Sequence, residues 1–63
     1  MENKLKAYRK AAGLTQWQLA AQLNTSQARL WQWENNLTPI KKFNKQRIAV
    51  IFKVPIETIF PEA

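Results

Sequence analysis

Two helix starts follow one another closely along this chain, at Thr15 and at Ser26. In the stretch LTQWQL, Thr15 occupies an N-cap position and Gln18 follows at the third helical position, which together form a capping box. Asn24 lies where the chain must turn before the second start, and asparagine accepts the positive φ that a sharp turn requires. Residues 16–35 are therefore predicted to form a helix, a tight turn and a second helix.

Helical spacing continues on both sides of this unit, and no run of alternating apolar and polar residues predicts a strand. Gly13, the only glycine, follows a first helix at the point where a left-handed C-terminal cap is favoured. Pro39 prevents the third helix from continuing, a fourth helix is expected over about 44–53, and a short fifth helix is expected over 55–60. We expect an all-α chain with a single domain over residues 1–63.

Two tryptophans lie two positions apart in the third helix, and such positions point in different directions. Trp33 follows Leu30 by three residues and shares its face. We therefore expect Trp33 in the core and Trp31 on the outer surface. The neighbouring helices supply the other expected core positions, which are Leu5, Tyr8, Ala12, Leu19, Ala20, Leu23, Ile48, Ile51 and Phe52.

The charge of the chain favours one kind of partner and argues against several classes of function. Ten Lys and Arg residues against four Asp and Glu residues give the 63-residue chain a formal net charge of +6, which favours a polyanion. With no histidine and no cysteine, the chain lacks the groups of an acid–base pair, an activated nucleophile or a metal site. We expect no enzyme activity, no cofactor, no metal and no small-molecule substrate.

The sequence contains no predicted targeting or membrane segment. The N-terminal stretch MENKLKAYRK has no apolar run typical of a signal peptide. The longest apolar run, IAVIF, is too short to cross a bilayer. We expect a cytoplasmic protein with no membrane partner.

The stretch AYRKAAGLTQWQLAAQLNTSQARLWQWENN resembles the lambda-repressor and Cro-like (Xre-type) helix-turn-helix family of phage and bacterial transcription regulators. It matches the family pattern of Arg, Gly-Leu-Thr-Gln, Leu-Ala and Trp-Glu-Asn without gaps, and the similarity continues through RIAVIFKVPIETIF. The resemblance implies a compact five-helix bundle whose third helix, here 26–35, enters the major groove of double-stranded DNA. It also implies a repressor that binds a palindromic operator as a homodimer, although the residues themselves leave the oligomeric state open.

Three positions of the third helix match the base-reading positions of the family, namely Gln27, Ala28 and Gln32. Glutamine amides pair with adenine N6 and N7, and a small apolar Ala28 fits against a thymine methyl group. Arg29 adds a guanidinium with the reach to contact a guanine or a phosphate. A solvated polar helix face explains each side chain taken alone, whereas the basic charge of the chain favours base reading for the set.

The resemblance also implies contacts to the sugar–phosphate backbone. Gln16 matches a phosphate contact at the start of the second helix, where free N–H groups attract an anionic oxygen. The contact of Trp31 follows from its outward position and not from the resemblance: we expect its ring to cover a sugar or a thymine methyl group and its N–H to reach a phosphate. The segment after the third helix adds the amide of Asn35 and three lysines, Lys41, Lys42 and Lys45. The ammonium groups of the lysines need only charge to bind phosphate.

Arg9 and Glu34 match an arginine and a glutamate that form a salt bridge in relatives. We expect a carboxylate beside the core residue Trp33 to be half-buried and therefore to need a partner of opposite charge. We expect a structural ion pair that ties the first helix to the end of the third. Two separate surface charges are the alternative.

The sequence departs from the family pattern at three places. Asn24 replaces the usual glycine of the turn, which we expect to be tolerated. Lys42 and Lys45 fall where apolar residues of the fourth helix are common, which predicts a late start for that helix and a longer basic loop before it. Trp31 stands where a small or polar residue is usual.

A protein-interaction module of another class, such as an antitoxin-like or adaptor domain, is the alternative function. Such a module keeps the helical fold and uses exposed Trp17 and Trp31 to bind a partner protein, because large exposed apolar side chains mark contact sites. Replacement of Trp31 distinguishes the two functions. A loss of DNA binding favours the regulator, and a loss of protein binding favours the module.

Overall fold

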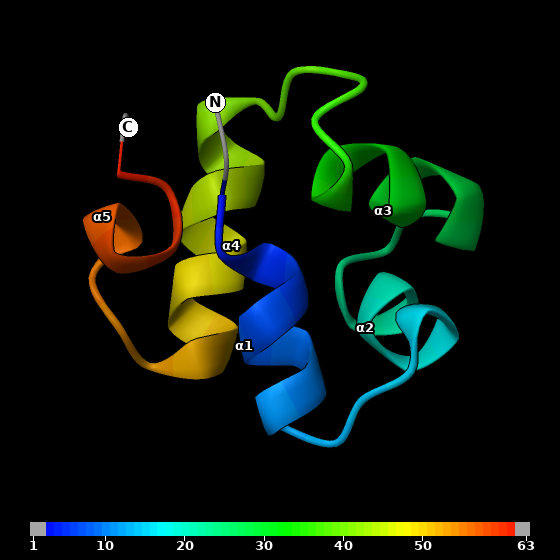
Figure 1. Cartoon of the computed structure of the whole chain (residues 1–63), viewed down its shortest axis with the longest axis horizontal. Coiled ribbons are helices and arrows are strands. Elements are labelled where there is room, and N and C mark those ends of the chain that lie inside the picture. The colour runs from blue at the N-terminus through cyan, green and yellow to red at the C-terminus, as the bar shows by residue number, and fades with distance from the viewer. Residues whose placement is uncertain (1–2, 62–63) are drawn as a thin grey trace.

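The computed structural model describes residues 3–61 and contains five α-helices and no strand within that range (Figure 1). The helices are α1 (Leu5–Ala11), α2 (Gln16–Gln22), α3 (Gln27–Glu34), α4 (Lys42–Phe52) and α5 (Ile56–Ile59). The expected all-α fold class is therefore confirmed. Residues 1–2 and 62–63 of the predicted domain lie outside the described residues.

The ends of the first three helices follow the signals in the sequence. The Thr15 side chain accepts from the Gln18 backbone N–H at 3.1 Å, and the Gln18 side chain accepts from the Thr15 backbone N–H at 2.8 Å, so the capping box is complete. Gly13 has φ 73° just after α1, and Asn24 has φ 55° in the turn between α2 and α3. Asparagine at this position therefore adopts the left-handed conformation that glycine usually supplies. Ser26 caps α3 by accepting from a backbone N–H at 3.1 Å.

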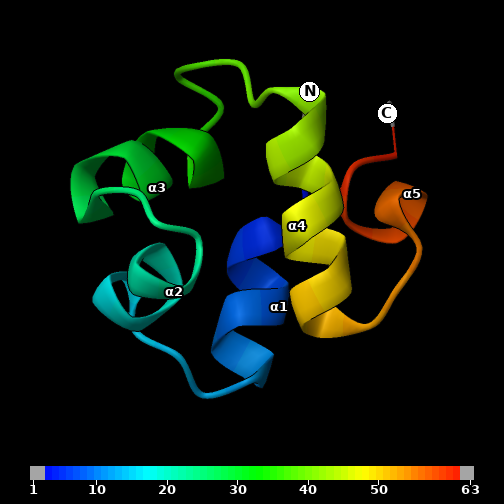
Figure 2. The same ribbon diagram turned by 180° about the vertical axis from the view of Figure 1, so that it is seen from behind.

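The core lies where the helices meet, with α1 and α4 in the middle of the molecule. Views from opposite sides show α2 and α3 on one side of this central pair and α5 on the other (Figures 1 and 2). Trp33 is 4% exposed and Trp31 is 46% exposed, so the expected assignment of the two tryptophans is confirmed. The side chains that are fully buried come from all five helices and the residue after α2, namely Leu5, Leu19, Leu23, Leu30, Ile48 and Ile59.

The predicted late start of the fourth helix is wrong. Helix α4 begins at Lys42 rather than at about residue 44, and Lys41 is its N-cap residue with extended backbone. Lysine is a good helix former. Because the Lys42 side chain is exposed, the helix begins there without burying a charge. Ile48 is fully buried as expected. The expected core residues Tyr8, Ile51 and Phe52 are only partly buried, and Ala12, the residue that follows α1, is exposed.

Helix α4 also ends in a way that the sequence did not indicate. Lys53 follows its last residue with φ 57°, in the left-handed region that favours glycine. Its backbone N–H donates to the carbonyl of Val50 at 3.2 Å. The chain thereby reverses toward Pro55 and α5.

None of the helices within residues 3–61 is long and apolar enough to span a membrane.

Candidate nucleic-acid interface

Helix α3 has one face in the core and one face in solvent. Leu30 and Trp33 are buried, whereas Ala28, Arg29 and Gln32 are exposed. Gln27 lies at the start of the helix and is half-buried. The exposed face thus carries amide, methyl and guanidinium groups together, the chemical groups that contact base edges.

A chain of side-chain hydrogen bonds joins the start of α3 to its end. Gln27 Nε2 donates to Gln16 Oε1 at 2.6 Å, and Gln16 Nε2 donates to Glu34 Oε1 at 3.0 Å. The same carboxylate accepts from Arg9 Nε at 2.6 Å and from Arg9 Nη2 at 3.3 Å. Residues from α1, α2 and both ends of α3 are therefore held in one network.

The carboxylate at one end of this network fixes the direction of the donors along it. An ionised carboxylate only accepts, so the amide nitrogen of Gln16 must face Glu34. The amide oxygen of Gln16 then faces Gln27, which must present its nitrogen in turn. The oxygen of the Gln27 amide is left free of this network, together with one N–H of its amide nitrogen.

Arg9 and Glu34 are both buried and form a salt bridge at 2.6 Å, with 9% and 0% of their side chains exposed. Arg9 Nη1 also donates to the carbonyl of Leu14 at 2.8 Å, just before α2. The guanidinium therefore ties α1 both to the start of α2 and to the end of α3. The pair thus links Leu14, which precedes the N-cap residue of α2, to the last residue of α3.

The residues after α3 are arranged in two groups. Lys41 and Lys42 are exposed at the start of α4, where their ammonium groups are accessible. Lys45 is partly buried, and its Nζ lies 5.4 Å from the centre of the Phe60 ring. Lys45 is therefore less accessible than Lys41 and Lys42, whose side chains are exposed. Asn35 uses its side chain to donate to the carbonyl of Trp31 at 2.9 Å.

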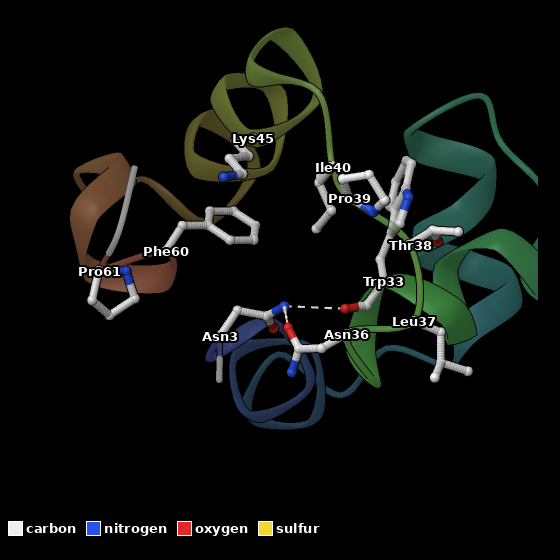
Figure 3. A pocket seen from close by; sticks show the side chains of 10 residues that line it. All are labelled: Asn3, Trp33, Asn36, Leu37, Thr38, Pro39, Ile40, Lys45, Phe60 and Pro61. Atoms are coloured by element: carbon white, nitrogen blue, oxygen red, sulfur yellow. Dashed lines mark hydrogen bonds between the residues drawn. The ribbon is translucent and has the colours of Figure 1, made fainter. Parts of the chain in front are cut away.

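A pocket of about 390 Å³ lies beside the C-terminal end of α3 (Figure 3). Lys45 and Phe60 line one side, and Trp33 and Asn36 line the other. Asn3 donates to the carbonyl of Trp33 at 3.0 Å and to the side chain of Asn36 at 3.2 Å. Sequence reasoning missed Asn3, because no local pattern signals a contact between segments so far apart in the chain.

The helix-turn-helix carries two exposed tryptophans, one on each of its helices. Trp31 is on α3 itself, one turn after Gln27 and Ala28. Trp17 lies in the first turn of α2, and its side chain is 68% exposed. Gln32, near the end of α3, accepts from the Thr38 hydroxyl at 3.4 Å, which links this face to the following loop.

Comparison with known proteins agrees with this geometry. The model of the HTH_3 helix-turn-helix family, of the Cro/C1 type, matches residues 5–59, which include all five helices. A search of curated proteins finds no significant match. Within residues 3–61 no group of His, Cys, Asp and Glu side chains is placed to hold a metal ion. The chain belongs to the Cro/C1-type helix-turn-helix family, whose members are DNA-binding transcription regulators.

Proposed function

We propose that this regulator binds specific sequences in duplex DNA and acts as a small phage or bacterial repressor by occupying an operator. The observation that carries the proposal is the two-faced character of α3. Leu30 and Trp33 are buried, whereas the guanidinium of Arg29 and the amide of Gln32 are exposed. A helix of this kind on a chain of net charge +6 suits the major groove, whose base edges offer hydrogen-bond partners between two rows of phosphates.

Gln27, Ala28 and Gln32 are the proposed base-reading residues. The free amide oxygen of Gln27 accepts from adenine N6, while its remaining N–H reaches N7. Gln16 restrains this amide through a hydrogen bond of 2.6 Å, which lowers the entropy lost when the base is bound. Arg29 is the proposed contact to a guanine or a phosphate at the edge of the same face.

The proposed backbone contacts lie on either side of this face. Gln16 and Trp31 approach one strand, with the Trp31 ring against a sugar and its N–H toward a phosphate. Asn35, Lys41 and Lys42 approach the phosphates from the segment after α3, since both lysines are exposed. Lys45 joins them only by leaving the Phe60 ring, so its contribution is smaller.

A homodimer on a palindromic operator is the proposed binding form. One short helix contacts only a few base pairs, and two copies related by a two-fold axis double the length of sequence that is read. The two copies then recognise half-sites about one helical turn apart.

The interaction-module alternative is supported by Trp17, which is 68% exposed and has no hydrogen-bonding or core role in the described structure. Selection of bound sites from random duplex DNA tests the regulator against this alternative. The proposal predicts an enriched motif with two-fold symmetry in which adenines face Gln27 and Gln32. Enrichment of no motif from such a pool contradicts sequence-specific binding, and an enriched motif without symmetry contradicts the homodimer.

A further inference from the structure

A shallow groove runs along the exposed face of α4. In Figure 2 this helix lies in front of α1. The volume of the groove is about 430 Å³, and the groove is lined by Gln22 at the end of α2 and by Phe43, Gln46, Arg47, Val50 and Ile51 of α4. None of the residues proposed above to contact DNA lines it. We refer to these six residues as the α4 groove.

Two apolar side chains of the α4 groove, Phe43 and Val50, are exposed without a role inside the molecule. Phe43 is 55% exposed and Val50 is 75% exposed, and neither packs against the core. Ile51 does pack against the core, so the floor of the groove is part of the folded interior. Large apolar side chains that group around a groove on a small protein mark a contact surface.

The spacing along α4 suits another helix. Phe43, Arg47 and Val50 are separated by four and three residues, so they form one row over two turns, about 10 Å long. A row of this kind is what a second helix packs against when its own side chains fill the spaces between the ridges. The row therefore favours a helical occupant over an extended strand.

The charge of the groove limits which helix can occupy it. Arg47 is the only ionisable side chain that lines the groove, and it lies between the two apolar residues. A second copy of the chain has few carboxylates to offer Arg47. Within residues 3–61 these are Glu34, which is paired with Arg9, and Glu57 on α5. A second copy that docks its own row about a two-fold axis brings one Arg47 toward the other, which is repulsive. Duplex DNA is also a poor occupant, because the row is apolar and offers a single cation.

We propose that the α4 groove binds an amphipathic helix of a partner protein. Apolar side chains of that helix pack against Phe43 and Val50, and a carboxylate at the matching position accepts two N–H donors from the Arg47 guanidinium. Because the α4 groove shares no residue with the proposed DNA contacts, a partner bound there leaves α3 free to hold DNA. The proposal does not depend on α3 reading bases.

A selection experiment tests the proposal without knowledge of the natural partner. The whole chain is immobilised, and a phage-displayed library of helical peptides with randomised outer positions is selected on it in the absence of DNA. Enriched peptides are expected to carry an acidic residue flanked by apolar residues at helical spacing. Failure to enrich any peptide, or enrichment of peptides that lack an acidic residue at this place, overturns the proposal.

Charge reversal then locates the contact. A fluorescein-labelled copy of an enriched peptide is titrated with each variant, and R47E is expected to weaken binding by about tenfold or more. Replacement of the peptide's acidic residue by lysine is expected to restore binding to R47E and to weaken binding to the original chain. Equal binding of both peptides by both proteins contradicts an ion pair at Arg47.

A matched pair of variants separates the groove from general surface effects. V50E places a carboxylate in the groove and is expected to abolish peptide binding, whereas L37E changes an apolar residue of 61% exposure outside the groove and leaves binding within about twofold. Both variants are first shown to melt like the original chain. Equal losses for L37E and V50E, or sedimentation equilibrium showing a dimer that V50E disrupts, contradict a heterologous helix as the occupant.

Discussion

Glu34 receives donors from two other helices, the guanidinium of Arg9 and the amide of Gln16. Its side chain is fully buried, so the carboxylate has no access to water to replace them. At the residue scale, this one carboxylate therefore contributes both to the stability of the fold and to the arrangement of the candidate interface. The same atoms that hold α1 to α3 also set the direction of the amide at Gln16 and, through it, of the amide at Gln27.

Replacement of Glu34 tests the buried pair. Glu34→Ala leaves the Arg9 guanidinium buried without a partner, and the expected loss in the free energy of unfolding is about 3–5 kcal/mol. Urea denaturation followed by circular dichroism measures it. Glu57→Ala is the control, because Glu57 is exposed and its replacement changes stability by about 0.5 kcal/mol or less. Equal midpoints for the two variants contradict the structural role of the pair.

The two tryptophans of α3 provide a second test at this scale. Trp33→Ala removes a side chain that is 4% exposed and is expected to cost about 3–5 kcal/mol of stability, which leaves little folded protein. Trp31→Ala is expected to change stability by about 0.5 kcal/mol or less and to weaken DNA binding. Thermal melting and fluorescence anisotropy with labelled duplex measure the two effects. Unchanged DNA affinity for Trp31→Ala, with loss of a protein partner, assigns this indole to the interaction module.

At the scale of the helices, the sequence predicts where a helix begins or ends when the signal lies within a few residues of that point. The capping box of α2 requires only Thr15 and Gln18, three residues apart, and both hydrogen bonds are present. The start of α4 has no side-chain cap, so nothing near Lys42 indicates it. The family pattern predicts a later start, because apolar residues are usual where this chain has Lys42 and Lys45. An exposed lysine, however, is as compatible with a helix as an apolar residue is.

Tertiary contacts between distant segments are the part that the sequence did not predict. Asn3 donates to the carbonyl of Trp33, which lies 30 residues further along the chain, and the Lys4 backbone N–H donates to the carbonyl of Ile59 at 2.8 Å. Neither contact follows from spacing within one helix. The position of Lys45 over Phe60 belongs to the same class, since it requires α5 to return beside the start of α4.

Gly13 and Lys53 each follow a helix and have left-handed backbone conformation. Removing the glycine at one position and introducing a glycine at the other are expected to change stability in opposite directions. Gly13 has φ 73° with nothing within 4 Å of the position of an added Cβ, so Gly13→Ala is expected to cost about 1–2 kcal/mol through backbone conformation alone. Lys53 has φ 57°, and Lys53→Gly is expected to raise stability by up to about 1 kcal/mol, as the relief of strain exceeds the greater entropy of the unfolded chain. Denaturation midpoints that move in the same direction for both variants contradict this account of the caps.

At the scale of the whole molecule, positive charges outnumber negative ones, with ten Lys and Arg residues against four Asp and Glu residues. The chain has a formal net charge of +6 on a body that measures 25 × 23 × 19 Å over the described residues. One of its carboxylates, that of Glu34, is consumed by the buried ion pair. The surface that remains attracts a polyanion over a distance of about a Debye length, before any specific contact forms.

This charge predicts a steep dependence of DNA binding on salt. Arg29, Lys41, Lys42 and Lys45 release counterions when they approach phosphates, so the plot of log affinity against log salt concentration is expected to have a slope of roughly −3 to −5 per protomer. Lys42→Ala is expected to reduce the slope by about one, on specific and random duplexes alike. Titrations at several salt concentrations measure both, and an affinity that does not change with salt contradicts DNA as the main partner.

The discrimination between specific and random DNA by Gln27→Ala and Gln32→Ala tests base reading by α3 most directly. The measurement is the ratio of dissociation constants for a selected duplex and a random duplex, at one salt concentration, for the original chain, each glutamine variant and Lys42→Ala. We predict that each glutamine variant loses about 1–3 kcal/mol on the selected duplex and almost nothing on the random one, so the ratio falls. Lys42→Ala is predicted to weaken both duplexes equally and to leave the ratio unchanged. A ratio that is the same for the original chain and both glutamine variants shows that α3 does not read bases.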